Sequence, residues 1–341
     1  MKRTFYFLFA CIMLGAITTR AEKFTVDNTI DESDPEQKLY KTLQEAYNRA
    51  DDNDTIYVEG SATAYRSLTL TKPLTIIGPG YFLEENLGAE AETLNAAVSS
   101  FSFSGGSEGS KIEGLSFYLP NISISIATDD IEISQCLIQV SVRIARNSIR
   151  DLNLNRNFIS SRSFILFSYP NISGPPINLY FANNIVGNPF EIPNGTTGGI
   201  INNIFLLERF NLGASSSLEI HNNILLSTTG TEIVVPLVNG TNVSHNIAAL
   251  QTFGTANGNQ INVLASQIFV EEGTTDGQYQ IKADGLAAGT GRDGVDIGAF
   301  GGPEPYRLSG VPSIPRIIDL SSDGFVNEEG ELVITIQATT N

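Results

Sequence analysis

Phe181-Ala-Asn-Asn184-Ile185, Ile200-Ile-Asn-Asn203-Ile204 and Ile220-His-Asn-Asn223-Ile224 are copies of one phrase, in which two asparagines stand between apolar residues. The looser copies are Ile133-Ser-Gln-Cys136-Leu137, Leu154-Asn-Arg-Asn157-Phe158 and Val243-Ser-His-Asn246-Ile247. Counted on the second asparagine position, the six copies follow one another after 21, 27, 19, 20 and 23 residues. A near-constant period of this length is typical of stacked coils.

One coil of a parallel β-helix needs two or three short strands and the bends between them, which about twenty residues supply. Each coil pairs with the coils above and below it at about 4.8 Å, so equivalent side chains lie on top of one another. The apolar positions then form a continuous core. The asparagines can form a ladder of side-chain amides across a bend, where they tolerate left-handed backbone angles. We therefore predict an all-β, single-stranded parallel β-helix, a solenoid, and interpret the asparagines as structural.

The composition agrees with many short strands joined by turns. The 341 residues include 31 glycines and no tryptophan, 17% are charged and 41% are hydrophobic. The repetition favours one elongated domain over two compact ones. Outside the N-terminal leader the chain has one cysteine, Cys136, so no intrachain disulfide is expected there. Because Cys136 stands at an asparagine position of the repeat, we expect it to be a small inward-facing filler.

The first 21 residues have the pattern of a secretory signal peptide. Two basic residues precede an apolar run over residues 5–17, and Ala21 ends the segment with small residues at the −3 and −1 positions. A lipoprotein signal ending at Cys11 is the alternative, but the apolar run before it is short and Phe9 is bulky where a small residue is needed. We therefore expect a secreted, periplasmic or cell-surface protein. No later segment has the roughly 18 apolar residues that a membrane helix needs.

The net charge argues against one class of partner. The formal charge is −17, and it becomes −20 once the three basic residues of the leader are removed. Such a charge repels nucleic acid. It also repels an acidic polysaccharide, unless a local basic patch overcomes the repulsion.

The segments that flank the repeats predict two end structures. Thr42-Leu-Gln-Glu45 is a capping box, and apolar residues at helical spacing follow it, so we expect a short amphipathic helix over about 43–50 that covers the open end of the stack. Four prolines from Pro303 on indicate an extended linker. Residues 324–340 predict a β-hairpin, which we expect to dock on the stack because a lone hairpin is marginal in water. The predicted organisation is a signal peptide at 1–21, a β-helix domain at 22–302 and a linker with a hairpin at 303–341.

Two segments interrupt the period. Residues 80–98 contain Glu84, Glu85, Glu90 and Glu92 and predict a solvated acidic loop with a helical turn. Residues 169–176, with a Gly-Pro-Pro sequence, account for the 27-residue step.

The entry coils resemble a known family. Thr42-Leu-Gln-Glu-Ala-Tyr-Asn-Arg-Ala50, Asp54-Thr-Ile-Tyr-Val58 and Leu74-Thr-Ile-Ile-Gly-Pro-Gly80 resemble the first coils of the pectin-lyase-like superfamily, and most of all secreted bacterial β-helix proteins of unassigned activity. Asp293-Gly-Val-Asp-Ile-Gly-Ala-Phe-Gly-Gly302 is similar to the last coil of many of them. The resemblance implies a right-handed parallel β-helix over about residues 24–302. Since the superfamily includes lyases, hydrolases, esterases and binding proteins, it does not select an activity.

The repeat places charged residues side by side. It puts Asp130 above Asp151, and Asp129 above Arg150, on adjacent coils. Two carboxylates about 4.8 Å apart beside a guanidinium are the arrangement that a calcium or uronate site would need. All four residues are therefore candidate catalytic residues, and Asp130 and Asp151 are candidate metal ligands. The structural alternative is an ion pair between Asp129 and Arg150 at the edge of two strands.

The same stretch is rich in arginine. Guanidinium groups bind the carboxylates or sulfates of sugars with two parallel hydrogen bonds. The candidate ligand-binding residues are Arg143, Arg146, Arg150, Arg156 and Arg162. This function requires at least three of them to emerge on one face, and the alternative is a set of solvated surface arginines.

Enzymes of the superfamily imply further features. Galacturonan hydrolases resemble one another in an Asn-Thr-Asp motif, an Asp-Asp pair and a Gly-His-Gly, of which Ala127-Thr-Asp129-Asp130 is a partial echo; the sequence has no Gly-His-Gly. Calcium-dependent pectate lyases use acidic ligands from neighbouring coils and an arginine base. Asp130, Asp151 and Arg150 are compatible with that set, and Asn178 stands where a third ligand would be needed.

The two histidines, His221 and His245, stand one column apart in the repeat. We expect their side chains on opposite sides of the wall and interpret them as structural.

Two functions remain open. The first is a non-catalytic secreted or surface protein that binds polysaccharide or a protein partner along the solenoid wall, which the lack of a complete catalytic set favours. The second is a polysaccharide lyase or glycoside hydrolase for acidic glycans such as pectate, centred on the two Asp pairs and Arg150; a lyase would use Ca²⁺ as its cofactor. The positions of the arginines discriminate the two, since convergence in a groove favours catalysis and dispersion favours binding.

Overall fold

The computed structural model describes residues 21–86, 93–120, 122–160, 167–168, 177–187, 189–206, 210–212, 217–226, 233–234, 242–313, 315–326 and 330–339. Residues 1–20 of the predicted signal peptide, Glu90, Glu92, Arg162 and the predicted insertion at 169–176 lie outside these residues.

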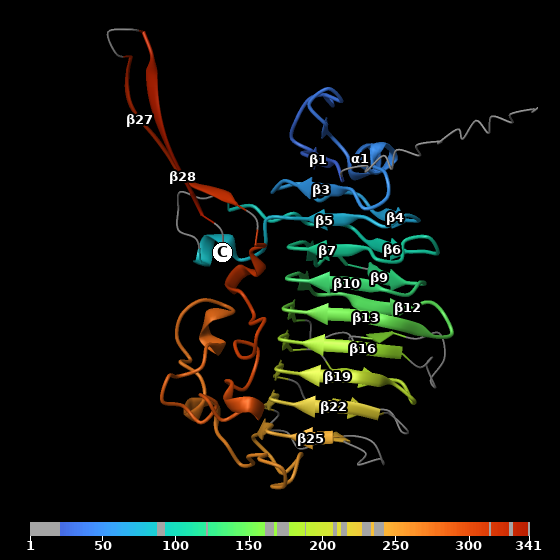
Figure 1. Cartoon of the computed structure of the whole chain (residues 1–341), viewed down its shortest axis with the longest axis vertical. Coiled ribbons are helices and arrows are strands. Elements are labelled where there is room, and N and C mark those ends of the chain that lie inside the picture. Colours follow the sequence, from blue (N-terminus) through green and yellow to red (C-terminus); the bar gives the residue numbers. More distant parts are fainter. Residues whose placement is uncertain are drawn as a thin grey trace, which may run out of the picture.

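The described strands form stacked parallel sheets that wind into a solenoid (Figure 1). The long sheet has 11 strands, in the order β2 (Leu39–Tyr40), β1 (Lys23–Val26), β3 (Thr55–Val58), β5 (Thr75–Ile77), β7 (Lys111–Glu113), β10 (Ile131–Ser134), β13 (Ile149–Asn155), β16 (Ile177–Ala182), β19 (Thr197–Ile201), β22 (Ser217–His221) and β25 (Asn242–Ser244). The seven-stranded sheet contains β26 (Ile247–Ala248), β23 (Ile224–Leu225), β20 (Ile204–Phe205), β17 (Ile185–Val186), β14 (Phe158–Ile159), β11 (Leu137–Ile138) and β8 (Ser116–Phe117). The third wall is divided between β15 (Phe167–Ser168), β12 (Ser141–Ile144), β9 (Ser123–Ile126), β6 (Phe101–Phe103) and β4 (Leu68–Leu70), and a second sheet of β18 (Phe190–Ile192), β21 (Phe210–Leu212) and β24 (Ile233–Val234). The prediction of an all-β chain of stacked parallel coils is confirmed at this level.

The repeated phrase marks the turn between the long sheet and the seven-stranded sheet. Its first apolar residue is the next-to-last residue of a strand of the long sheet, and its last apolar residue begins a strand of the seven-stranded sheet. The first asparagine position has a positive φ in every copy, as at Asn183 (55°) and Asn202 (54°). Asparagine adopts this backbone more readily than most residues because its short polar side chain bonds locally.

The second asparagine position forms the predicted ladder. The backbone N–H of Asn184 and its Nδ2 both donate to Oδ1 of Asn203, at 2.9 and 3.0 Å, and the same pair of bonds joins Asn203 to Asn223 at 3.0 Å. The chain of bonds starts at Cys136, which is buried as expected, and continues to Asn259. Asn259 follows after only 13 residues, so the period does not reveal it.

The core lies inside the coils. Successive coils place aromatic rings on top of one another, and the centroids of neighbouring rings among Phe181, Phe190, Phe205 and Phe210 lie 4.9 to 6.2 Å apart. These four rings are fully buried.

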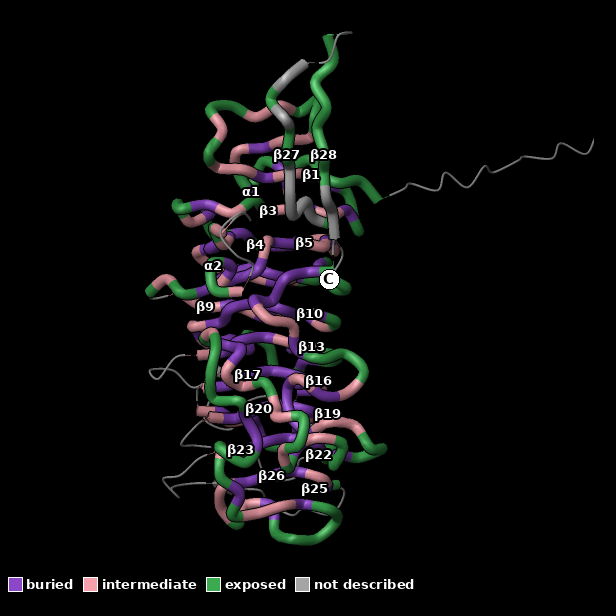
Figure 2. The backbone as a smooth tube through the Cα atoms, turned by 90° about the vertical axis from the view of Figure 1, so that its left-hand side faces the viewer, coloured by how far each residue is buried: buried purple, intermediate pink, exposed green. Residues whose placement is uncertain are grey.

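Residues 249–313 are here called the strap. They first add one short turn, in which Gln260 bridges Ile247 in parallel and Asn259 joins the ladder, and then run back along the stack (Figure 1). The strap covers the outer face of the seven-stranded sheet, and Figure 2 views the stack from this side. Its short 3-10 turns are Ala265–Gln267, Gly277–Tyr279, Arg292–Gly294 and Leu308–Gly310. The apolar residues buried between the strap and the sheet include Phe158, Ile185, Ile204, Ile224, Phe269, Ile297 and Tyr306.

The interpretation of Asp293–Gly302 as a last coil is wrong, because these residues belong to the strap. This segment forms no strand in the structure. Asn183 Nδ2 donates to the carbonyls of Ala299 and Gly301 at 2.9 and 2.7 Å, and Asn202 Nδ2 donates to the carbonyl of Asp296 at 3.2 Å. The first asparagine column therefore fastens the strap, and the coils of the β-helix domain end before residue 302.

The N-terminal helix α1 (Leu43–Arg49) lies beside β1 at one end of the stack (Figure 1). Its capping box is present as predicted. The N–H of Glu45 donates to Thr42 Oγ1, and the N–H of Thr42 donates to Glu45 Oε2, both at 3.2 Å.

Replacing Thr42 with alanine should lower the free energy of unfolding by about 1 kcal/mol, because the N–H of Glu45 loses its acceptor. Urea denaturation followed by circular dichroism measures the change. Gln44→Ala, on the exposed side of the same helix, is the control and should change the midpoint little. Equal effects of the two substitutions would contradict the capping role.

The acidic segment after Gly80 contains the predicted helical turn, α2 (Leu83–Asn86). Glu85 is not simply solvated, because its carboxylate accepts from the N–H and the hydroxyl of Thr275 in the strap, at 2.6 and 2.9 Å.

The predicted C-terminal hairpin is present, with β27 (Arg316–Val326) and β28 (Leu332–Thr339) paired antiparallel and Val326 opposite Leu332. Its first strand begins at Arg316, eight residues before the predicted start at 324. It extends away from the stack instead of docking on it (Figure 1). Leu332, Val333, Ile334 and Ile336 are 49% to 60% exposed. No helix in the described part of the chain has the length and apolar character needed to span a bilayer.

Candidate functional site

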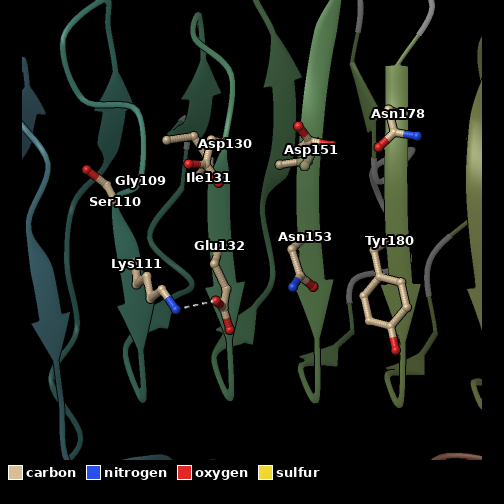
Figure 3. Close-up of a pocket in the computed structure, with 11 residues that line it drawn as sticks. Gly109, Ser110, Lys111, Asp130, Ile131, Glu132, Asp151, Asn153, Asn178 and Tyr180 are labelled. Carbon is tan, nitrogen blue, oxygen red and sulfur yellow. Dashed lines mark ion pairs between the residues drawn. The ribbon is translucent and has the colours of Figure 1, made fainter.

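A shallow groove of about 240 Å³ crosses four strands on the outer face of the long sheet (Figure 3). Its lining residues form two rows that run from coil to coil. One row contains Gly109, Asp130, Asp151 and Asn178, and the other contains Lys111, Glu132, Asn153 and Tyr180.

The strand period explains why these side chains face outward. In β10, Ile131 and Ile133 are buried in the core, so Glu132 between them points to the outer face. The parallel register places Glu132 beside Lys111 on one side and beside Asn153 on the other, and Asn153 beside Tyr180. The second row is therefore a consequence of the same register that builds the ladder.

Asp130 and Asp151 stand on adjacent coils, as predicted (Figure 3). Both have a positive φ, 54° and 55°. Asp151 lies where β13 has one residue more than β16, because the register shifts between Ile149 and Leu152. Such a bulge re-aims a side chain. Both carboxylates are exposed, and neither makes a side-chain hydrogen bond or ion pair with the residues that the structure describes.

Asp129 and Arg150 form the ion pair that the sequence offered as the structural alternative. The guanidinium donates from Nε and Nη2 to Asp129 Oδ2 at 3.1 and 2.9 Å, and the N–H of Arg150 donates to Oδ1 at 2.9 Å. The bonds from the Arg150 N–H and side chain, with Arg146 at 3.5 Å, hold the pKa of Asp129 below its ordinary value. The pair therefore stabilises the fold at neutral pH, and this contribution is lost as the pH falls through the lowered pKa. Arg150 is 77% exposed, so the contribution is small.

The described arginines do not converge. Arg143 lies in β12 on the third wall, and Arg146 and Arg150 lie around the turn that leads into β13. Arg156 stands at the other end of β13, where its Nε donates to Asn155 Oδ1 at 2.8 Å. Arg162 is outside the described residues. None of the four described arginines lines the groove.

Lys111, Glu132, Asn153 and Tyr180 are groove residues that the sequence did not single out, and Tyr180 carries the largest exposed apolar surface among them. Its side chain is 46% exposed, and its coil neighbour on the far side is Gly199, which has no side chain. Asn178, on the same strand, donates to Thr197 Oγ1 at 3.0 Å. The alternation of β16 could have revealed Tyr180, because Leu179 and Phe181 on either side are core residues.

The chain matches no family model, no curated protein and no solved structure. The stacked parallel sheets agree with the resemblance noted in the sequence at the level of fold alone.

The described residues do not fit a calcium site. They include no group of three His, Cys, Asp or Glu side chains that could hold a metal ion. Asp130 and Asp151 alone supply fewer oxygens than the roughly six to eight that Ca²⁺ takes. His221 and His245 are offset by one column, as expected, since His221 pairs in register with Ser244.

Proposed function

We propose that the protein is a secreted or cell-surface β-helix of the pectin-lyase-like kind, with right-handed coils closed at the N-terminal end by α1. We propose further that it binds an extended polysaccharide in the groove of the long sheet without cleaving it. The observation that carries this proposal is the exposed ring of Tyr180 at the end of a row of polar side chains.

The groove has the shape and chemistry for a sugar chain. Four coils at about 4.8 Å spacing give it a length of about 14 Å, which suits a short stretch of an oligosaccharide. The ring of Tyr180 offers an apolar surface for the hydrophobic face of a sugar, a role in which tyrosine can replace the absent tryptophan. Carboxylates and amides such as those of Glu132 and Asn153 can hydrogen-bond sugar hydroxyls. Backbone pairing on both sides of each strand keeps the groove rigid, which limits the entropy lost on binding.

Tyr180→Ala should weaken binding to an immobilised glycan about tenfold, because the ring contact is lost while the strand keeps its pairing. A glycan array followed by calorimetry with the best ligand measures the effect. Tyr118→Ala is the control, since Tyr118 is 42% exposed and does not line the groove. Equal losses in both variants, or none in Tyr180→Ala, would contradict the proposal.

Polysaccharide lyase activity is the second candidate function, because Asp130 and Asp151 lie on adjacent coils. Arg150, the base that a lyase would need, is bound to Asp129 and does not line the groove. We expect no unsaturated uronate when the mature protein is incubated with pectate, alginate or glycosaminoglycans, with or without calcium. Growth of the absorbance of a 4,5-unsaturated product, lost in Arg150→Ala, would establish the lyase instead.

A further inference from the structure

We propose that the groove selects glycans that carry free, protonated amino groups, with Asp130 and Asp151 receiving the ammonium. This inference rests on the proposed function, and it names the class of sugar. It reverses the charge of the ligand that the arginine-rich stretch suggested.

The charges that line the groove are unbalanced. Its titratable acids and base are Asp130, Glu132, Asp151 and Lys111. Lys111 pairs with Glu132 at 3.1 Å, so its charge is already compensated. Asp130 and Asp151 remain without a partner among the described residues, which leaves the groove with a formal charge of −2.

The nearby arginines do not cancel this charge. Arg150 and Arg146 both reach Asp129, which lies one residue before Asp130 and is not part of the lining. Asp129 therefore holds the guanidinium groups away from the groove. A uronate or a sulfated sugar would meet two carboxylates with no free cation, which disfavours its binding.

An ammonium group satisfies the unpaired carboxylates better than other cations. Adjacent coils hold the two side chains about 4.8 Å apart, and like charges at that spacing repel each other until a cation is shared. An ammonium has three N–H donors, so it can bond both carboxylates at once. A bare Ca²⁺ would need more oxygens than this pair supplies.

The neighbouring residues indicate that the amine belongs to a sugar. Asn178 continues the row of Asp130 and Asp151 on the next coil, and Tyr180 lies on the same strand as Asn178 (Figure 3). An amine bound at the carboxylates therefore places the rest of the ligand beside an amide and an exposed ring, which are groups that contact sugar hydroxyls and the sugar ring.

The test compares three probes on the mature chain at low salt: an oligomer of β-1,4-linked glucosamine, its fully N-acetylated counterpart and oligogalacturonate. We expect the glucosamine oligomer to bind about tenfold more tightly than the N-acetylated oligomer, and oligogalacturonate to bind least. Asp130→Asn with Asp151→Asn should remove this preference, so that the glucosamine oligomer and the N-acetylated oligomer bind with equal affinity. Asp31→Asn with Glu32→Gln makes the same change in net charge on an exposed loop and should keep the preference.

Several outcomes overturn the inference. It fails if the wild type binds the N-acetylated oligomer or oligogalacturonate as tightly as the amine, or if the preference survives in the groove double variant. It also fails if the loop double variant loses the preference equally, because long-range charge then explains it. Equal binding of both glucosamine forms that still depends on Tyr180 would overturn only the amino selectivity. The absence of binding to any glycan would overturn the proposed function with it.

Discussion

Replacing Asn203 with alanine is expected to lower the free energy of unfolding by about 3–5 kcal/mol. Asn203 Oδ1 accepts from the N–H and the Nδ2 of Asn184 at 2.9 and 3.0 Å, and its Nδ2 donates to the carbonyl of Phe181 at 2.8 Å and to Asn223 Oδ1 at 3.0 Å. Alanine removes all of these bonds inside a core that holds no alternative partner. Two donors and a carbonyl are then left buried, and each costs about 1–3 kcal/mol.

Urea denaturation measures this effect, with Asn242→Ala as the matched control. Asn242 is an exposed residue at the start of β25, the last strand of the long sheet. Its Nδ2 donates to Glu219 Oε2 at 3.0 Å, so its replacement by alanine should change the free energy of unfolding by less than about 0.5 kcal/mol. If Asn203→Ala is no more destabilising than Asn242→Ala, the ladder does not hold the coils together.

Asp276→Ala is expected to weaken the attachment of the strap to the coils, and to lower the free energy of detaching it by about 3–5 kcal/mol. Asp276 is fully buried, and four donors surround its carboxylate. They are the N–H of Ser309 at 2.7 Å, the hydroxyl of Tyr306 at 3.0 Å, Asn86 Nδ2 at 3.0 Å and the hydroxyl of Thr274 at 3.3 Å. Alanine leaves the N–H of Ser309 without an acceptor and removes three further hydrogen bonds, whereas Asn86 Nδ2 and the hydroxyl of Thr274 keep their bonds to Ser309 Oγ and Asn86 Oδ1.

The same network joins the strap to the coils. The hydroxyls of Tyr306 and Tyr81 lie 2.7 Å apart, and burial raises the pKa of both tyrosines well above the ordinary value, so both stay neutral. Hydrogen exchange of residues 249–313 should therefore become much faster in Asp276→Ala than in the wild type. Asp276→Asn keeps one carbonyl oxygen as an acceptor, so the exchange of the strap should increase less in this variant than in Asp276→Ala. Asp284→Ala, at an exposed position of the strap, should leave the exchange unchanged, and equal exchange in all three variants would contradict the role of Asp276.

The register of the coils could be predicted because the repeat itself encodes it. Once the asparagines are aligned, Asp130 must lie beside Asp151, and Asp129 beside Arg150. The four described candidate arginines do not line the groove, although Arg146 and Arg150 both reach Asp129, because residues that are close in sequence can lie on different walls of a solenoid. A coil of about twenty residues passes all three walls, so Arg143 and Arg156 lie on different sides of the molecule.

The repeat period of the sequence could not predict the strap, because the sequence of the strap does not repeat. The first asparagine column holds it through backbone groups, and these are the same in every residue type. One signal was nevertheless present. Six of the seven two-residue strands in the seven-stranded sheet, all except β8, are apolar at both positions, as in Ile185-Val186 and Ile204-Phe205. Since one residue faces the core and the other faces outward, a second layer had to cover the outer face.

The contacts of the strap also limit the number of coils that this protein can have. Asn183, Asn202 and Asn222 bind successive points of the strap between Arg292 and Gly301, in reverse order along the chain. A duplicated coil would add about 4.8 Å of height, which an extended chain spans with about one and a half residues. Without a matching insertion, every asparagine beyond the duplication would face the wrong carbonyl. The length of the strap segment from Arg292 to Gly301 is therefore matched to the height of the three coils that it contacts.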